Sequence, residues 1–164
     1  MSKRLNLREF QQGLIDRLQA ADTAGTRIST LGVQIAGRNW LVEMGDISEV
    51  LPLPPVAAVP YAKPWFRGVA NMRGNLYSVT DMAAYHYGSV TPGSIQNRVL
   101  LVAGRYAFNA ALLVDRVLGL RDARDWQQND AGGFIEYRDG QGGAWRKLNI
   151  PGLLEQEKFL QVGG

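Results

Sequence analysis

The sequence has 164 residues, no cysteine, and 18 basic against 15 acidic residues, which gives a formal net charge of +3. A chain of this length favours one domain that buries a sizeable core without covalent cross-links. The lack of cysteine in the sequence excludes disulfides, thiolate metal sites and thiol catalysis. No basic run is longer than the pair Arg146-Lys147, which argues against a nucleic-acid binder.

No apolar stretch of the sequence approaches the ~20 residues that a membrane-spanning helix needs. The first twelve residues are basic in part but precede no apolar run, so they do not form a secretory signal. We therefore expect a soluble cytoplasmic protein without direct membrane insertion. Nineteen glycines, seven prolines and several alternating segments favour a mainly β fold rich in turns.

The first predicted element is an amphipathic helix in an N-terminal extension, residues 1–26, that precedes the main domain at 27–164. Asn6 and Glu9 form a capping box at its start. The apolar residues at helical spacing are Leu7, Phe10, Leu14 and Leu18. Such a helix either packs on its own domain or docks on a partner.

A first hairpin is predicted from residues 31–35 and 40–44, joined by a four-residue loop at 36–39. Asp46 then caps one short helical turn before the chain extends again through Val50. Five of the seven prolines lie between Pro52 and Pro64, which predicts an extended edge or crossover segment. Trp65 and Phe66, which follow it, are predicted core residues.

A second hairpin is predicted from Gly68 to Met82, with Arg73 and Gly74 at its turn. Gly74 takes a positive φ there without steric cost. Physical chemistry alone predicts that Arg73 is a solvated turn residue. A short helix follows at residues 82–87 and ends at Gly88.

The second half of the chain reads as further strands. An apolar strand at residues 98–103 is followed by another at 106–114, and Asp115 opens a turn into a third. Residues 122–133 are polar and predict a loop. Strands at 134–137 and 145–148 flank a glycine-rich tip, and Asn149 caps a final short helix with Pro151 in its first turn.

No catalytic or metal-binding set emerges from the sequence. His86 is the single histidine, and one histidine without cysteine makes a poor transition-metal site. A triad of Ser78, His86 and Asp81 lacks the nucleophile elbow that would support it. The carboxylates of Asp115, Asp122 and Asp125 neighbour arginines and are read as solvated ion pairs. We therefore expect a protein that is not an enzyme and uses no cofactor or metal.

One pattern in the second hairpin resembles the signature of the CheW-like family of chemotaxis adaptors. Ser78 stands where that family often has proline, and Val114, Asp115 and Val117 match its later V-D-x-V motif. The similarity extends from about residue 31 to residue 160. Within the family, the opening helix and residues 34–37 and 64–71 are most similar to adaptors of type IV pilus chemosensory systems. The residues that carry the signature are Gly68, Val69, Asn71, Arg73, Gly74, Leu76, Val79 and Asp81.

This resemblance implies a fold of two small five-stranded SH3-like β-barrels that share a hydrophobic interface. The first barrel is expected at residues 31–84 and the second at 98–148, with a short C-terminal helix. The resemblance also implies a scaffold that couples a methyl-accepting chemoreceptor to the regulatory domain of a CheA-type histidine kinase, at receptor arrays on the inner membrane.

The resemblance further implies two binding surfaces. The expected receptor-binding residues are Gly68, Asn71, Arg73 and Gly74. The expected kinase-binding residues are Val42, Ile47 and Val50. The alternative from a different class is a small β-barrel that stacks nucleic-acid bases on Trp40, Tyr77 and Tyr106.

Overall fold

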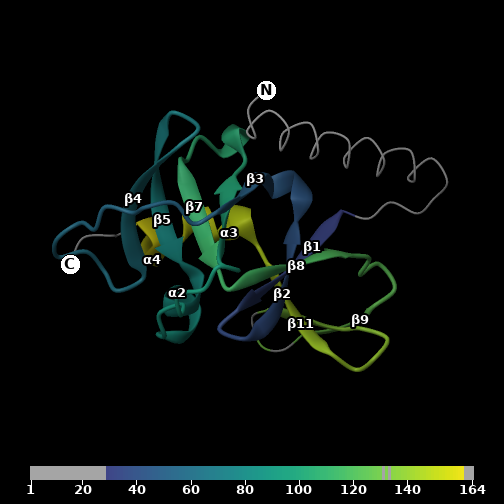
Figure 1. Cartoon of the computed structure of the whole chain (residues 1–164). Coiled ribbons are helices and arrows are strands. Elements are labelled where there is room, and N and C mark those ends of the chain that lie inside the picture. Colours follow the sequence, from purple (N-terminus) through teal and green to yellow (C-terminus); the bar gives the residue numbers. More distant parts are fainter. Residues whose placement is uncertain (1–28, 131, 133, 161–164) are drawn as a thin grey trace.

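A computed structural model describes residues 29–130, 132 and 134–160 of the chain. Two β-sheets lie side by side, with a few short helices beside them (Figure 1). The predicted N-terminal helix lies outside the described residues. Within the described part of the chain, no helix is long and apolar enough to cross a membrane.

The six-stranded sheet combines strands from the two ends of the described chain. Strands β2 and β11 pair in parallel, and the other neighbours pair antiparallel. In spatial order its strands are β8 (Arg116–Arg121), β1 (Thr30–Ile35), β2 (Arg38–Glu43), β11 (Ala144–Leu148), β10 (Ile135–Arg138) and β9 (Gln127–Asp130).

The five-stranded sheet is built from the middle of the chain. Strands β5 and β7 pair in parallel, and the remaining pairs are antiparallel. In spatial order its strands are β3 (Ile47–Pro52), β6 (Arg98–Val102), β7 (Ala110–Val114), β5 (Asn75–Asp81) and β4 (Phe66–Met72). Strands β3 and β4 are therefore its two edges.

The prediction of a mainly β fold is confirmed. The structure has two sheets, of six and five strands, where two five-stranded barrels were expected, and the predicted division of the chain between them at 31–84 and 98–148 is wrong. The short 3-10 helix η1 (Met44–Asp46) carries the chain from the first sheet to the second, and Asp115 carries it back. The first two strands thus pair with strands that are distant in sequence. The division that the resemblance implied did not include this exchange of strands between the two sheets.

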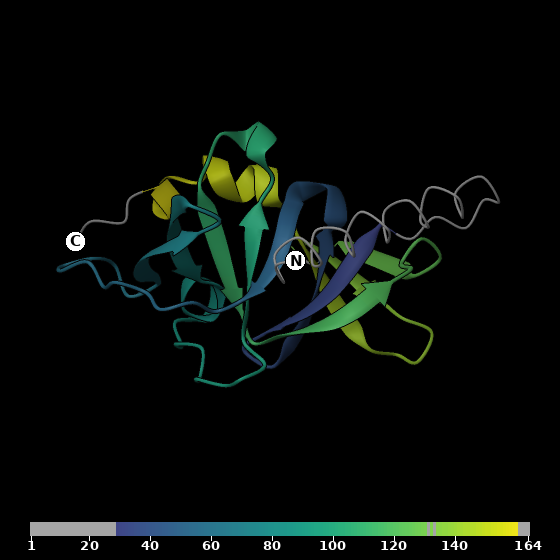
Figure 2. The ribbon, with the colours of Figure 1, turned by 45° about the horizontal axis from the view of Figure 1, so that its top comes forward.

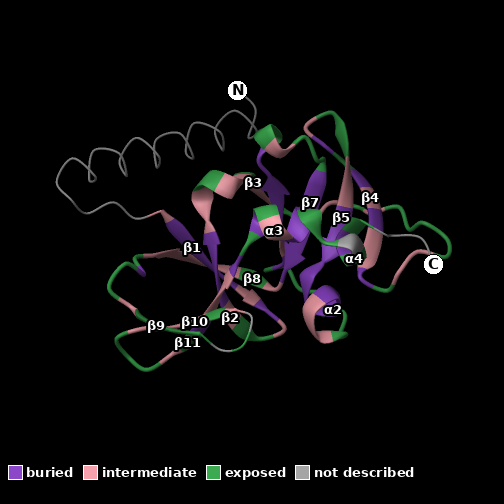
Figure 3. Cartoon of the chain, turned by 180° about the vertical axis from the view of Figure 1, so that it is seen from behind, coloured by how far each residue is buried: buried purple, intermediate pink, exposed green. Residues whose placement is uncertain are grey.

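The apolar residues form three clusters. The largest, the central cluster, combines residues of both sheets and the short helices. Each of the two smaller clusters is built around residues of one sheet. Strand β6 contributes to two of them. Val99 and Leu101 belong to the cluster of the five-stranded sheet, and Leu100 and Val102, on the opposite face of the strand, belong to the central cluster. Strands buried on both faces read as continuous apolar runs. Figure 3 shows this in the buried strand β7.

The predicted bounds of α2 and the predicted start of α3 are confirmed. Asp81 caps α2 (Met82–Tyr87) by accepting from the backbone N–H of Ala84, and Gly88 ends it with φ 75°. Asn149 caps α3 (Ile150–Glu155), which continues into α4 (Glu157–Leu160). Figure 2 shows these C-terminal helices beside the five-stranded sheet, where Leu153 and Phe159 join the central cluster.

Three local predictions are wrong. The first hairpin turns through two residues, Ala36 and Gly37, with φ 53° and 72°, instead of four. Residues 127–130, predicted as loop, form β9, whose polar side chains are all exposed at the sheet edge. Strand β7 begins only at Ala110, because residues 104–106 form the 3-10 helix η2 (Gly104–Tyr106).

Candidate interaction surface

The turn of the second hairpin consists of Arg73 and Gly74 alone. Their φ values are 55° and 80°, and two successive positive φ values are what a type I′ hairpin turn requires. Arginine rarely adopts this conformation, whereas glycine adopts it readily. The predicted hairpin and the positive φ of Gly74 are therefore confirmed.

The side chain of Arg73 is held by an acidic partner on another strand. Its guanidinium lies 2.6 Å from the Glu49 carboxylate, and the two side chains are only 14% and 8% exposed. The prediction of a solvated turn residue is therefore wrong. Its partner Glu49 lies 24 residues earlier in the chain, in β3. Nothing in the spacing of the two residues indicates that they meet.

Gly68 has a structural role in the same hairpin. Its φ is 133°, and a Cβ atom there would lie 2.1 Å from the carbonyl oxygen of Ala57. Ala57 exchanges two backbone hydrogen bonds with Val69, of 2.8 and 3.0 Å. Gly68 therefore allows the proline-rich segment to lie against the outer edge of β4.

The exposed part of the hairpin lies beyond this contact. Asn71 is exposed and pairs across the hairpin with Leu76, whose exposure is 60%. Opposed residues of antiparallel strands share one face of the sheet. The predicted receptor-binding residues thus divide into an exposed Asn71 and Gly74, an ion-paired Arg73 and a buried Gly68.

The predicted kinase-binding residues do not form one surface. Val42 has no exposed area and packs in the central cluster, so its side chain is unavailable to a partner and its assignment is corrected. Ile47 and Val50 are half-buried on β3. Between them, Ser48 is exposed at a bulge in the pairing with β6.

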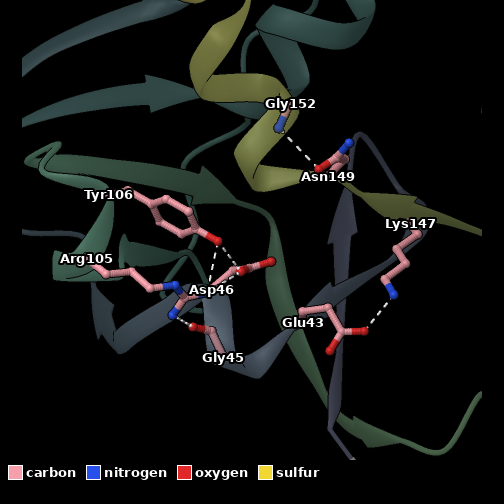
Figure 4. Close-up of polar contacts among 8 residues, drawn as sticks. All are labelled: Glu43, Gly45, Asp46, Arg105, Tyr106, Lys147, Asn149 and Gly152. Atoms are coloured by element: carbon pink, nitrogen blue, oxygen red, sulfur yellow. Dashed lines mark hydrogen bonds and ion pairs between the residues drawn. The ribbon is translucent and has the colours of Figure 1, made fainter.

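A polar cluster precedes this strand (Figure 4). The Asp46 carboxylate accepts hydrogen bonds from Tyr106, at 2.5 Å, and from Arg105, at 2.8 Å. Arg105 also donates to the carbonyl of Gly45. The hydrogen bond to Asp46 is the main cause that raises the pKa of the Tyr106 hydroxyl. Asp46 was predicted to cap a helical turn, but its side chain instead ties η2 to the start of β3.

Comparison with known proteins identifies the family of this chain. Residues 29–157 match the CheW-like domain family. The chain belongs to the CheW-like family. Over 104 residues the chain is 36% identical to Protein PilI of Pseudomonas aeruginosa, and this match covers 63% of the chain but only 58% of that relative.

The fold of this CheW-like domain also resembles a solved structure. The crystal structure of the scaffolding protein TtCheW from Thermoanaerobacter tengcongensis superposes with a TM-score of 0.63 at 18% sequence identity. The similarity covers 79% of the chain and 94% of TtCheW. At this identity the comparison establishes the shared fold.

Ser78, His86 and Asp81 do not form a triad and have separate roles in the CheW-like domain. Asp81 is fully buried and accepts hydrogen bonds from Thr91 Oγ1, at 2.6 Å, and from the Thr91 backbone. Ser78 donates to the carbonyl of Asn109. Among the described residues, no three histidine, aspartate or glutamate side chains are grouped so as to hold a metal ion.

His86 belongs to an aromatic stack in the CheW-like domain. Its ring centroid lies 4.7 Å from that of Trp40. Burial, followed by the nearby charges of Arg146 and Lys158, lowers its pKa from 6.5 to about 4. The imidazole is therefore neutral near pH 7.

The aromatic residues of the nucleic-acid alternative do not form a stacking platform. Trp40 is 3% exposed and lies in the central cluster. Tyr77 packs against the cluster inside the five-stranded sheet, and Tyr106 is bound to Asp46. Bases stack on exposed aromatic faces, so this arrangement does not favour the alternative.

Proposed function

We propose that this chain is a non-catalytic adaptor that couples a methyl-accepting chemoreceptor to a CheA-type histidine kinase in a chemosensory array. The observation that carries the proposal is the match of residues 29–157 to the CheW-like domain. The similarity to PilI supports type IV pilus twitching motility as the output. In this proposal the chain acts in the cytoplasm, at receptor arrays on the inner membrane.

The proposed receptor surface is the exposed end of the second hairpin. Asn71 and Leu76 provide a polar and an apolar side chain on one face, next to the turn at Arg73 and Gly74. Interfaces combine apolar contacts with a polar rim, and arginine is enriched in them. Gly68 has an indirect role, because it allows the backbone of Ala57 to pack against the same hairpin.

The proposed kinase surface is strand β3, with Ile47 and Val50 as its apolar residues. Among the described strands, β3 pairs with β6 only, so it is an edge strand of its sheet. Apolar residues on such an edge are suited to docking another domain. The bulge at Ser48 brings an exposed position to the middle of this surface.

The experiment is a pull-down of proteins from the native cell, with the wild-type chain as bait. We expect recovery of a histidine kinase and a methyl-accepting receptor. Asn71→Arg changes an exposed position, so it should fold and lose the receptor while it retains the kinase. The matched control is Arg116→Glu, which alters an exposed side chain on the other sheet and should retain both. Recovery of neither partner by the wild type overturns the proposal.

The kinase surface needs its own variants. Ile47→Asp introduces a charge at a half-buried position, so its melting temperature must be compared with that of the wild type. Ser48→Arg adds bulk at an exposed position and should leave the fold intact. We expect Ser48→Arg to lose the kinase and retain the receptor. Retention of both partners would show that β3 is not the kinase surface.

A further inference from the structure

A groove of about 440 Å³ lies where the six-stranded sheet meets helices α2, α3 and α4. Among the described residues that line it are the cations Arg146, Lys147 and Lys158, and none of these lining residues is an aspartate or glutamate. Lys147 is paired with Glu43 outside this lining. Two cations, Arg146 and Lys158, therefore face the groove with no acidic side chain in its lining.

Buried side-chain nitrogen atoms without partners line the same groove. Trp40 Nε1, Arg146 Nε and His86 Nε2 are buried and have no hydrogen-bond partner among the described residues. Indole and guanidinium N–H groups can only donate. Buried donors are normally paired, so the groove is complementary to a ligand that carries acceptor oxygens.

The guanidinium of Arg146 is fixed in place by aromatic rings. Its carbon lies 3.6 Å from the centroid of Phe134 and 5.0 Å from that of Trp40. Lys158, in α4, donates to the carbonyl of Tyr85 at 2.6 Å. Positioned charges bind a ligand at a smaller entropic cost than free ones.

A second groove, with several apolar residues in its lining, continues from the cationic groove. It has a volume of about 510 Å³ and shares Phe134 and Leu148 with the first, and Ile135 and Pro151 also line it. The two carboxylates in its lining, Glu43 and Asp46, are ion-paired with Lys147 and Arg105. Ile135 is 46% exposed. Together the two grooves offer more room than one small anion fills, and they place an apolar surface next to a cationic one.

We propose that these two adjoining grooves bind a peptide segment of a partner protein in which acidic side chains neighbour apolar ones. The acidic side chains lie against Arg146 and Lys158, and the apolar side chains cover Ile135 and Pro151. The site goes beyond the adaptor proposal, because it lies outside both the second hairpin and β3. Its failure would leave the pull-down result unaffected.

The test uses a fluorescein-labelled peptide with two leucines, one glycine and three glutamates, and measures its binding by fluorescence anisotropy. A control peptide carries glutamine in place of each glutamate. His86 is the only histidine of the chain, so its imidazole NMR signals report ligand at this groove. We expect saturable binding of the acidic peptide, a shift of these signals, and much weaker binding of the control peptide.

The variants separate this groove from the general charge of the protein. Arg146→Gln and Lys158→Gln should each weaken binding by about fivefold or more, the size of one lost charge contact. Arg116→Gln makes the same charge change at an exposed residue outside the groove and should have less than about a twofold effect. Lys158 is itself exposed, so its variant remains informative if Arg146→Gln does not fold.

Three results would overturn the proposal. One is the absence of saturable binding of the acidic peptide. Another is an equal loss of binding in Arg116→Gln, which would indicate nonspecific attraction. The third comes from inorganic phosphate as an added probe: if phosphate shifts the His86 signals and the peptide binds no more tightly than phosphate does, the groove holds a simple anion only.

Discussion

The guanidinium of Arg73 lies 2.6 Å from the carboxylate of Glu49, and this ion pair joins opposite edges of the five-stranded sheet. Arg73 follows edge strand β4, and Glu49 lies in edge strand β3. The pair therefore connects the two strands that the backbone ladder leaves furthest apart. The receptor surface proposed at the hairpin and the kinase surface proposed on β3 are linked through it.

We predict that removal of either charge destabilises the fold. Glu49→Gln leaves the guanidinium of Arg73 largely buried without its counter-charge. Arg73→Gln likewise leaves the buried carboxylate of Glu49 without a counter-charge. Each substitution should lower the free energy of unfolding by about 3 kcal/mol. Equilibrium urea denaturation measures this, and the double variant should lose less than the sum of the single losses.

An exposed ion pair provides the control. Arg124 and Asp122 form an ion pair of 2.8 Å, and their side chains are 49% and 37% exposed. Asp122→Asn should therefore cost no more than about 0.5 kcal/mol. Strictly additive losses at Glu49 and Arg73 would contradict the inferred coupling of the two sheet edges. Arg73→Glu would bring two carboxylates together, so we expect it to be destabilised as well.

The second prediction concerns the glycines of the same hairpin. Gly68→Ala places a Cβ atom 2.1 Å from the carbonyl oxygen of Ala57, a backbone atom that cannot swing aside. The contact with the proline-rich segment must open, and we expect a loss of more than about 3 kcal/mol. Gly74→Ala has a positive φ of 80° but open space around it, so it should lose only about 1 kcal/mol.

Thermal unfolding of the two alanine variants, side by side, checks this difference. Limited proteolysis gives a second readout, because detachment of the proline-rich segment should expose residues 53–64 to cleavage in Gly68→Ala alone. Similar melting temperatures for the two variants would show that the approach of Ala57 does not constrain the hairpin.

The third prediction is a loss of stability in mild acid. Burial, followed by Arg146 and Lys158, lowers the pKa of folded His86 from 6.5 to about 4. The unfolded chain therefore binds a proton between these values when the folded protein does not. The stability that this residue contributes is fully present above pH 6.5 and is lost as the pH falls toward 4. The shift corresponds to about 3 kcal/mol at most.

His86→Gln isolates this effect, because glutamine does not titrate. Urea denaturation of the wild type and the variant at several pH values between 7 and 4 should show a steeper loss for the wild type. An NMR titration of the imidazole measures the pKa of the folded state directly. A value near 6.5 would contradict the inferred burial and the influence of the two cations.

Local structure was largely predictable from this sequence, because its signals are short-range. The alternation of apolar residues indicated most strands, and Gly88 and Asn149 marked helix ends that the structure confirms. Strand β9 was missed because its residues are polar and exposed at a sheet edge. There, backbone pairing with β10 determines the strand, and the side chains give no period-two signal.

Relationships across long sequence separations were not predictable in the same way. The pairing of β2 with β11 and the contact of Arg73 with Glu49 depend on how the chain crosses between sheets. The family resemblance implied two β units with a shared apolar interface. It also implied that Val42 binds a partner at the surface, which is wrong. Alternation could not reveal the error, because both faces of β2 carry apolar residues that the structure buries in different clusters.

The last prediction concerns the buried carboxylate of Asp81. It accepts hydrogen bonds from the backbone N–H of Ala84 and from both the backbone and the hydroxyl of Thr91, and Arg67 pairs with it at 3.2 Å. Asp81→Asn keeps the volume but turns an N–H group toward donors. We expect a loss of about 3 kcal/mol, because buried donors lose a charged partner.

Thr91→Val and Thr91→Ser distinguish the hydroxyl from the rest of this network. Valine removes one donor and leaves the other bonds to Asp81 in place, so it should lose about 1 kcal/mol. Serine keeps the hydroxyl and should lose less than valine. Amide hydrogen exchange at Ala84 adds a local readout, since Asp81→Asn should speed its exchange more than Thr91→Val does. If Thr91→Val were as damaging as Asp81→Asn, the hydroxyl contact, rather than the helix cap, would dominate the stability of this region.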